Sequence, residues 1–215
     1  MARPTAISDE TLLEAARDVF LEHGIRATTA EVARRAGVSE GTLFKRFRTK
    51  QGLFEAAMTR SFEEDAKRFV GSLLERVGKG TLRGELEDVA LRGIDFFRKI
   101  VPLHMMCWSN PGKDGLPVSP SLEGREHPAL GGRRLFEAYF EAERRLGRLR
   151  NVDVGVLARV FMGAVYNFAA MEVMLAAEDP LPMPAETFAR GLVDILLRGI
   201  EANSPEARPA RRTRA

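Results

Sequence analysis

The stretch TTAEVARRAGVSEGTLFKRFRTKQGLF, residues 28–54, decides the fold. Thr28 followed three residues later by Glu31 is a capping-box pattern, which predicts the start of a short helix. Gly37 is the residue type expected just past the end of that helix, and Ser39 is a good cap for the next one. Two short helices joined by a tight turn that contains glycine form a helix-turn-helix.

The second helix of this motif is predicted over residues 40–47 and begins with small side chains. Gly41 and Thr42 allow its N-terminus to approach a duplex closely, where backbone N–H groups and the helix dipole favour phosphate. The spacing turns three apolar side chains to one side, those of Leu43, Phe44 and Phe47. Two basic side chains, Lys45 and Arg46, are expected to project from the opposite, exposed face.

Basic residues concentrate around the motif. The whole chain has a formal net charge of only +3, yet residues 26–50 contain seven Lys and Arg against two Glu. Residues 1–25 contain two Arg against five acidic residues. A local basic patch on a nearly neutral protein indicates a polyanionic partner at one surface, although an ordinary solvated face has similar charges.

With the apolar first helix LLEAARDVFLEHG, residues 12–24, the motif resembles the DNA-binding region of the TetR family of regulators. The resemblance implies that three N-terminal helices and the start of a fourth bind DNA, and that the other helices form a variable dimerisation and ligand domain. The expected fold class is therefore all-α. We expect a DNA-binding domain over residues 1–55, a larger helical effector-binding and dimerisation domain over 56–203, and a disordered basic tail over 204–215.

The resemblance also assigns roles to individual residues. Thr29 and Ala30 match positions where the family's second helix touches the DNA backbone or a base, and Lys50 matches a lysine that meets phosphate. The recognition helix starts with four matching residues, Ser39, Glu40, Gly41 and Thr42. Phe44 replaces the family's commonest residue, a tyrosine whose hydroxyl binds phosphate, so that hydrogen bond is unavailable. Gly52 also departs from the family pattern, in which a good helix former is commoner at this position.

Physical chemistry separates these DNA-binding candidates further. Arg48 and Lys50 are suited to neutralising phosphate, which gives salt-sensitive affinity without sequence information. Three side chains are better candidates for reading base edges, namely Thr42, Lys45 and Arg46. Glu40 has two equal interpretations: its carboxylate accepts a hydrogen bond from cytosine, or it favours the positive end of the helix.

Helical periodicity dominates the rest of the chain. Ser8 is expected to cap the first helix, and a long fourth helix begins at Lys50 and stays apolar on one face to Leu73. Further helices are predicted over about residues 81–101, 128–148, 153–177 and 186–202. The uncharged run from Val160 to Met171 is too short to span a bilayer, which needs ~20 residues, and predicts a buried helix.

The last two helices are strongly apolar, and the resemblance implies that they form a four-helix bundle with a second copy. Small residues such as Gly163 would allow close approach of helices. The middle helices supply large, adaptable side chains suited to a small apolar effector, although the same residues also suit an ordinary core. The candidate ligand-binding residues are Phe97, Met105, Trp108, Phe161, Met162, Tyr166, Asn167 and Met171.

No motif for catalysis, metal binding or a cofactor is found. The sequence contains no Gly-rich phosphate loop, no paired-histidine or Cys/His metal spacing and no nucleophile elbow. The single cysteine, Cys107, excludes an internal disulfide, fits a reducing compartment and is expected to be a buried, inert thiol. The N-terminus lacks the apolar segment of a secretory signal.

We therefore expect a cytoplasmic DNA-binding regulator and no enzyme. Its partners would be a double-stranded DNA operator, a second copy in a homodimer and a small apolar effector, with no membrane involved. The simplest mechanism is repression that ends when the ligand releases the dimer from a pseudo-palindromic operator. The alternative is a helical DNA-binding regulator without a small-molecule effector, either constitutive or controlled by a protein partner.

Overall fold

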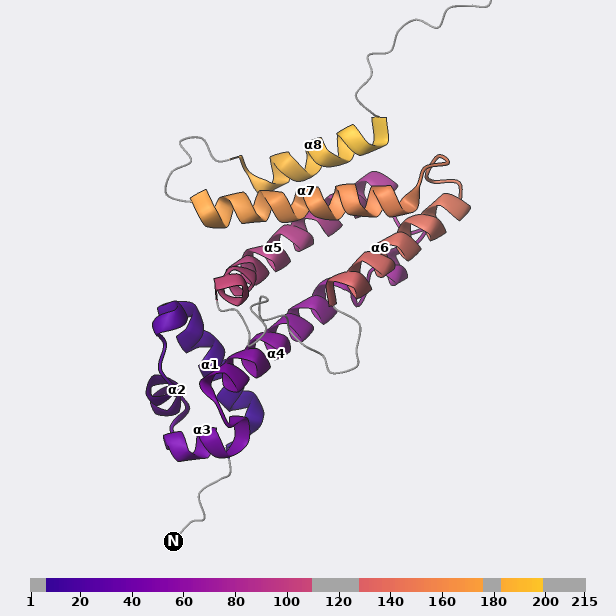
Figure 1. The fold of residues 1–215 in the computed structure, drawn as a ribbon. Coiled ribbons are helices and arrows are strands. Elements are labelled where there is room, and N and C mark those ends of the chain that lie inside the picture. Colours follow the sequence, from indigo (N-terminus) through magenta and orange to yellow (C-terminus); the bar gives the residue numbers. More distant parts are fainter. Residues whose placement is uncertain (1–6, 110–127, 176–182, 199–215) are drawn as a thin grey trace, which may run out of the picture.

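The computed structural model describes residues 7–109, 128–175 and 183–198, which contain helices and no strands (Figure 1). The α-helices are α1 (Asp9–His23), α2 (Thr29–Ala36), α3 (Glu40–Phe47), α4 (Lys50–Val70), α5 (Leu82–Ser109), α6 (Pro128–Arg145), α7 (Val154–Leu175) and α8 (Ala185–Arg198). Short 3-10 helices follow α1 and α4, at Gly24–Arg26 and Leu74–Arg76. The predicted all-α fold class is confirmed.

The helices form two groups that α4 connects. Helices α1 to α3 cluster around the start of α4 at one end of the molecule, and α5 to α8 pack together at the other (Figure 1). Helix α4 runs without interruption from the first group, which it contacts through α1 and α3, to the second, which it contacts through α5 and α6. The domain boundary expected at residue 55 therefore falls inside a continuous helix.

The predicted helix starts in the N-terminal group are confirmed by their caps. The side-chain oxygens of Ser8, Ser39 and Thr49 each accept a hydrogen bond from the backbone N–H three residues later. Thr28 and Glu31 form the full reciprocal capping box, with Glu31 also accepting a bond from the Thr28 N–H at 2.8 Å. These bonds satisfy N–H groups that the first turn of a helix leaves without partners.

Some predicted helix limits are wrong. Helix α5 continues through Pro102 to Ser109 instead of ending near residue 101. Proline removes one backbone hydrogen bond, but buried Leu103 and Cys107 keep the following turns packed against the core. Helix α4 ends at Val70 and α6 at Arg145, earlier than predicted. The predicted ends of the last two helices, the loop after Ser109 and the basic tail lie outside the described residues.

The core of the N-terminal group is formed by one face of each of its helices. The buried side chains are Leu12, Ala16, Val19, Phe20, Val32, Ala33, Leu43, Leu53, Phe54 and Ala57. The rings of Phe20 and Phe54 meet edge to face, with centroids 5.0 Å apart. Phe44 does not join Leu43 in this core, since 44% of its surface is exposed. Consecutive helical residues point about 100° apart, which explains this error of prediction.

The structure accounts for the glycine at position 52. A Cβ added to Gly52 would lie 2.6 Å from the carbonyl oxygen of Phe47, closer than such atoms approach in proteins. The chain turns sharply between α3 and α4, where Arg48 has a positive φ of 60°. Close backbone approach at this turn therefore outweighs the better helix propensity of other residues.

Helix α7 is buried along one face only within the described structure of a single chain. Its inner face buries Ala158, Phe161, Val165, Ala169 and Ala170. Its outer face exposes apolar side chains, including Val156, Val160 and Met174. Among the described residues, α7 has the length and apolar composition that a membrane-spanning helix needs. Core helices of soluble proteins often have both properties as well.

Candidate nucleic-acid interface

The turn between α2 and α3 fixes the angle at which α3 is presented. Gly37 has the left-handed conformation, with φ 69° and ψ 30°, in which a Cβ would be strained. The N–H of Val38 donates to the carbonyl of Ala33 at 2.9 Å, closing the end of α2. Leu43 then anchors α3 in the core, so the opposite face of α3 points outward.

A shallow depression lies along the exposed face of α3. It is lined by Ser39, Gly41, Thr42, Lys45 and Arg46, all of which the sequence predicted as DNA-binding candidates. Gly41 is exposed, and the atom nearest to an added Cβ would be the Ser39 hydroxyl oxygen, at 3.7 Å. Lys45 is exposed and forms no ion pair with any described residue, so its charge is available to a partner.

Arg46 differs from Lys45 in being held by the protein itself. One of its guanidinium nitrogens donates to the Asp9 carboxylate at 2.7 Å and to the carbonyl of Ile7 at 2.9 Å. These contacts tie the end of α3 to the start of α1. Sequence reasoning missed this pairing, because Asp9 and Arg46 lie far apart in the chain and no local pattern connects them.

Glu40 is also engaged within the interface. The hydroxyl of Thr29 at the start of α2 donates to a Glu40 carboxylate oxygen at 2.6 Å, across the two helices of the motif. The bond joins two residues that the sequence predicted as separate DNA contacts. Glu40 therefore holds the N-termini of α2 and α3 together. This role differs from the two predicted for its carboxylate, which were to accept a hydrogen bond from cytosine or to interact with the helix dipole.

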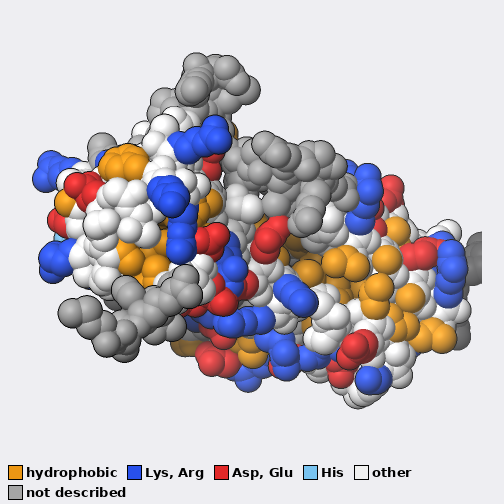
Figure 2. Space-filling view, turned by 90° about the horizontal axis from the view of Figure 1, so that it is seen from below, with side chains coloured by type: hydrophobic (Ala, Val, Ile, Leu, Met, Phe, Trp, Pro, Cys, Tyr) orange, Lys and Arg blue, Asp and Glu red, His pale blue; other side chains and the backbone are white. Residues whose placement is uncertain are grey.

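The remaining predicted residues surround this face. Ala30 on α2 and Phe44 on α3 are exposed. Arg48 and Lys50, on either side of the α3–α4 turn, are exposed as well. Seen from the α3 end of the molecule, Lys and Arg side chains project at several points around the N-terminal group (Figure 2). The structure thus brings the predicted DNA-binding residues to one end of the molecule.

Ion pairs between helices hold this unit together. Arg35 of α2 binds both carboxylate oxygens of Glu22 on α1, at 2.8 and 2.5 Å, and this pairing lowers the pKa of Glu22. Arg60 of α4 bonds to Glu10 of α1. Hydrogen bonds from Thr28 likewise lower the pKa of Glu31. The ionised forms of Glu22 and Glu31 are therefore favoured, and the ion pairs of Arg35 and Arg60 hold α1 against α2 and α4.

Family models match both groups of helices. The model for bacterial regulatory proteins of the TetR family matches residues 12–57, and the model for the C-terminal domain of AefR-like transcriptional repressors matches residues 125–199. Together they match more than half of the chain. The chain belongs to the TetR family. It is thus a DNA-binding transcriptional regulator and not an enzyme.

Individual relatives of this TetR regulator agree with the assignment. The HTH-type transcriptional regulator YvkB of Bacillus subtilis is 25% identical over 202 residues, 94% of this chain and 100% of YvkB. A TetR-family regulator from Mesorhizobium loti has a similar fold, with a TM-score of 0.71, 18% identity and coverage of 91% and 98% of the two chains. FadR from Bacillus subtilis, solved with stearoyl-CoA, gives a TM-score of 0.66 at 15% identity, covering 90% and 100%.

The predicted ligand-binding residues of this TetR regulator differ in how deeply they are buried. Phe97 and Phe161 are buried in the core, and Met162 is half-buried. The others are exposed on α5 or α7, namely Met105, Trp108, Tyr166, Asn167 and Met171. The rings of Phe97 and Tyr166 pack edge to face at 5.2 Å, so part of this set forms ordinary aromatic packing.

Cys107 is buried, as predicted, and should react slowly in the native regulator. Burial, with a smaller contribution from the charge of Glu55, raises the pKa of its thiol from 9.0 to about 11. With this shift, the folded protein has about 100-fold less Cys107 thiolate at pH 8 than the unfolded protein. We therefore expect iodoacetamide to alkylate the folded protein at least about 100-fold more slowly. Mass spectrometry of native and urea-unfolded protein measures both rates; equal rates would contradict the prediction.

The same shift predicts a pH effect on stability. The unfolded thiol ionises near pH 9 and the folded one near pH 11, so the unfolded state loses its proton first. The stability contributed by the protonated thiol is therefore fully present below about pH 9 and is lost as the pH rises towards 11. A Cys107→Ala variant should lack this component of the alkaline fall in unfolding free energy.

Proposed function

We propose that the protein is a homodimeric repressor that binds a pseudo-palindromic operator through α3 and is released by a small apolar ligand. The observation that carries this proposal is the exposed face of α3, where Gly41 leaves the helix N-terminus open and Lys45 has a charge without an ion pair among described residues. An open helix N-terminus beside a free lysine is suited to the major groove of DNA. The proposed location is the cytoplasm, where such DNA would be found.

Within this proposal the basic residues have different tasks. Lys45, with Thr42 on the same face, reads base edges, and Lys50 and Arg48 neutralise phosphates near the α3–α4 turn. Arg46 takes part once DNA competes with Asp9 for its guanidinium. Thr29, Ala30, Ser39, Glu40 and Phe44 complete the surface that faces the duplex.

The dimer surface in this proposal is the exposed apolar face of α7 and α8. Val156, Val160, Gly163, Asn167, Met171 and Met174 follow one another at helical spacing along α7 and are all exposed. On α8, Ile195 is 54% exposed one turn after Gly191, which has open space around it. Pairing of this face with its symmetry copy would cover the apolar side chains, and the two glycines permit close helix approach.

The effector in this proposal is apolar because the larger domain offers mainly apolar and aromatic side chains. FadR of Bacillus subtilis holds stearoyl-CoA in a similar fold, so this architecture accommodates a ligand with a long acyl chain. Release from DNA requires the ligand to bind preferentially the dimer form in which the two α3 helices have the wrong separation. A regulator without a small-molecule effector, either constitutive or controlled by a protein partner, is the alternative.

The test compares two lysines on the proposed interface. Lys50→Ala should weaken binding to all duplexes similarly and reduce the salt dependence of affinity by about one phosphate contact. Lys45→Ala should instead reduce discrimination between the operator and unrelated DNA. Its binding free energy should fall by about 1–3 kcal/mol for the operator and stay unchanged for unrelated DNA. Fluorescence anisotropy with a duplex from the protein's own upstream region, at several salt concentrations, measures both effects.

The control variant is Lys99→Ala, since Lys99 is an exposed lysine on α5 in the larger domain. It should leave affinity, salt dependence and discrimination unchanged. Unchanged operator binding in both the Lys45 and the Lys50 variants would refute the assignment of α3 as the recognition helix. Footprinting with and without added ligand separates the ligand-released repressor from the effector-free alternative.

A further inference from the structure

A cavity of about 160 Å³ lies in the larger domain, among α5, α6, α7, α8 and the connection between α6 and α7. Its apolar lining is formed by Leu86, Phe140, Leu149, Val152, Leu157, Leu196 and Leu197. Two basic residues of the α6–α7 connection, Arg148 and Arg150, complete the wall. None of these residues belongs to the DNA-facing surface or to the ligand-binding set predicted from the sequence.

The size and lining of the cavity limit what it would hold. A cavity of about 150 Å³ lined by aliphatic and aromatic side chains accommodates one benzene molecule. The cavity here has a similar volume and a mainly apolar lining, which suits one compact ring. It is too small for a long acyl chain, so its ligand would differ from the one that FadR holds.

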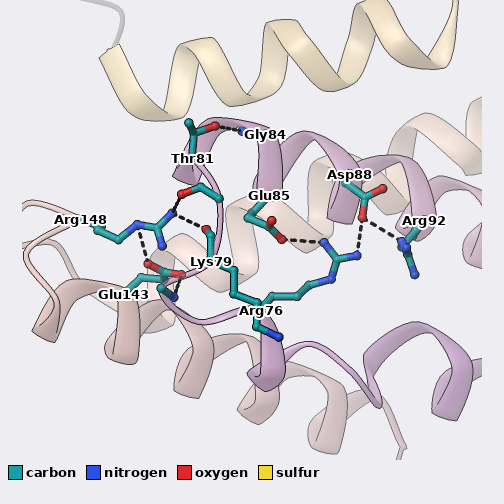
Figure 3. Close-up of polar contacts among 11 residues, drawn as sticks. Arg76, Lys79, Thr81, Gly84, Glu85, Asp88, Arg92, Glu143 and Arg148 are labelled. Carbon is teal, nitrogen blue, oxygen red and sulfur yellow. Dashed lines mark hydrogen bonds and ion pairs between the residues drawn. The ribbon is translucent and has the colours of Figure 1, made fainter.

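Arg148 has a fixed position on the cavity wall (Figure 3). Its Nε lies 3.2 Å from the carboxylate of Glu143, which is completely buried, and its Nη2 donates to the carbonyls of Lys79 and Gly80 at 2.9 and 3.1 Å. Its remaining nitrogen, Nη1, is buried without a hydrogen-bond partner in the described structure. A buried donor without an acceptor is uncommon, and the Arg148 side chain as a whole forms part of the cavity wall.

Arg150 adds a second positive charge to this wall. It is exposed and forms no ion pair with any described residue, whereas the charge of Arg148 is balanced by Glu143. The wall therefore has a net positive charge at the edge of an apolar cavity. Guanidinium groups match the geometry of carboxylates, so the complementary ligand has a carboxylate attached to a compact apolar body.

We propose that this cavity is a binding site for a small aromatic monocarboxylate. The ring occupies the apolar part, and the carboxylate pairs with Arg150 beside the guanidinium of Arg148. The site lies in the group of helices farther from α2 and α3 (Figure 1), and its existence does not depend on the proposed operator binding. Beside the site, buried Glu143 on α6 joins the segment that precedes α5, through the N–H of Gly78, to Arg148 of the α6–α7 connection.

The experiment is isothermal titration calorimetry of the full chain, without DNA, using sodium benzoate as the probe. We expect saturable binding of one benzoate per chain. Benzyl alcohol, which keeps the ring but lacks the negative charge, should bind at least tenfold more weakly. Absence of saturable benzoate binding, or equal affinity for the two compounds, would overturn the proposal.

Variants then locate the site. Arg150→Gln should weaken benzoate binding about tenfold, whereas Arg190→Gln, a matched exposed arginine on α8 outside the lining, should leave it unchanged. Leu157→Trp should fill the cavity and abolish binding while the helical circular dichroism stays the same. If Leu157→Trp unfolds, Arg150→Gln decides alone, because its exposed side chain has no ion pair to lose among described residues. Benzoate affinity unchanged by Arg150→Gln would refute the proposed location.

Discussion

Gly41→Glu is expected to lower operator affinity by about 100-fold without lowering the melting temperature. The new carboxylate would stand at the N-terminus of α3, where the proposed complex brings a DNA phosphate. Like charges brought together at an interface cost several kcal/mol, and about 2.7 kcal/mol corresponds to this loss of affinity. Fluorescence anisotropy on the duplex from the upstream region measures the affinity.

The fold should tolerate this change because position 41 is open. The atom nearest to a new Cβ is a hydroxyl oxygen at ordinary contact distance, 3.7 Å. Glycine inside a helix is less stable than alanine by roughly 0.5–1 kcal/mol, and an acidic side chain in the first turn interacts favourably with the helix dipole. Calorimetric melting should therefore show equal or slightly higher stability than that of the unchanged protein.

Two control variants separate the effect of the new charge from the effects of side-chain size and of position in the fold. Gly41→Gln has nearly the same volume without the charge, so it should lose less affinity than Gly41→Glu. Gly131→Glu adds the same charge on α6, where an added Cβ meets nothing within 4 Å, and should retain full operator affinity. Operator affinity of Gly41→Glu equal to that of the Gly131 control would show that α3 does not approach DNA by its N-terminus.

Glu143→Gln is expected to destabilise the protein by roughly 3 kcal/mol, because it removes one partner of a buried ion pair. The Glu143 side chain is 0% exposed; it accepts from the Gly78 N–H at 3.0 Å and pairs with Arg148. The variant would leave the largely buried Arg148 without its counter-charge. Urea unfolding followed by circular dichroism measures the loss as a lower midpoint at an unchanged slope.

The control for this prediction is Glu141→Gln on the same helix. Glu141 pairs with Arg144 and Arg145 near the surface, where solvent weakens the interaction, so its replacement should change the unfolding midpoint little. If Glu143→Gln were as stable as the Glu141 control, the buried pair would contribute no more than a surface pair. That result would refute the prediction that Glu143 stabilises the fold through a buried ion pair.

Local sequence patterns were sufficient to predict the N-terminal group. The caps at Ser8, Thr28, Ser39 and Thr49 and the glycine at position 37 act within three or four residues, so their positions in the sequence define the starts of α1 to α4 and the end of α2. The positions of candidate DNA contacts on α3 follow from helical spacing alone. Phe44 is the exception, because spacing does not decide how wide the buried face of a short helix is.

Features that depend on distant parts of the chain were not predictable. The Arg46–Asp9 pair and the Thr29–Glu40 bond join different helices, and the sequence contains no rule that pairs them. Glu143 looks like one more charged residue near the end of α6, yet it is completely buried. The cavity beside Arg148 exists only because four helices and a connection meet there.

The length and continuity of helix α4 allow a small movement at one of its ends to become a larger movement at the other. Its 21 residues form a rod about 30 Å long at 1.5 Å per residue. One end bears Lys50 beside the turn from α3, and near the other Phe69 stacks on Phe96 with ring centroids 5.1 Å apart. A tilt of only 5° about the aromatic end would displace the other end by about 2.6 Å over that length. In the proposed dimer, a small repacking of these aromatic rings would therefore change the distance between the two α3 helices.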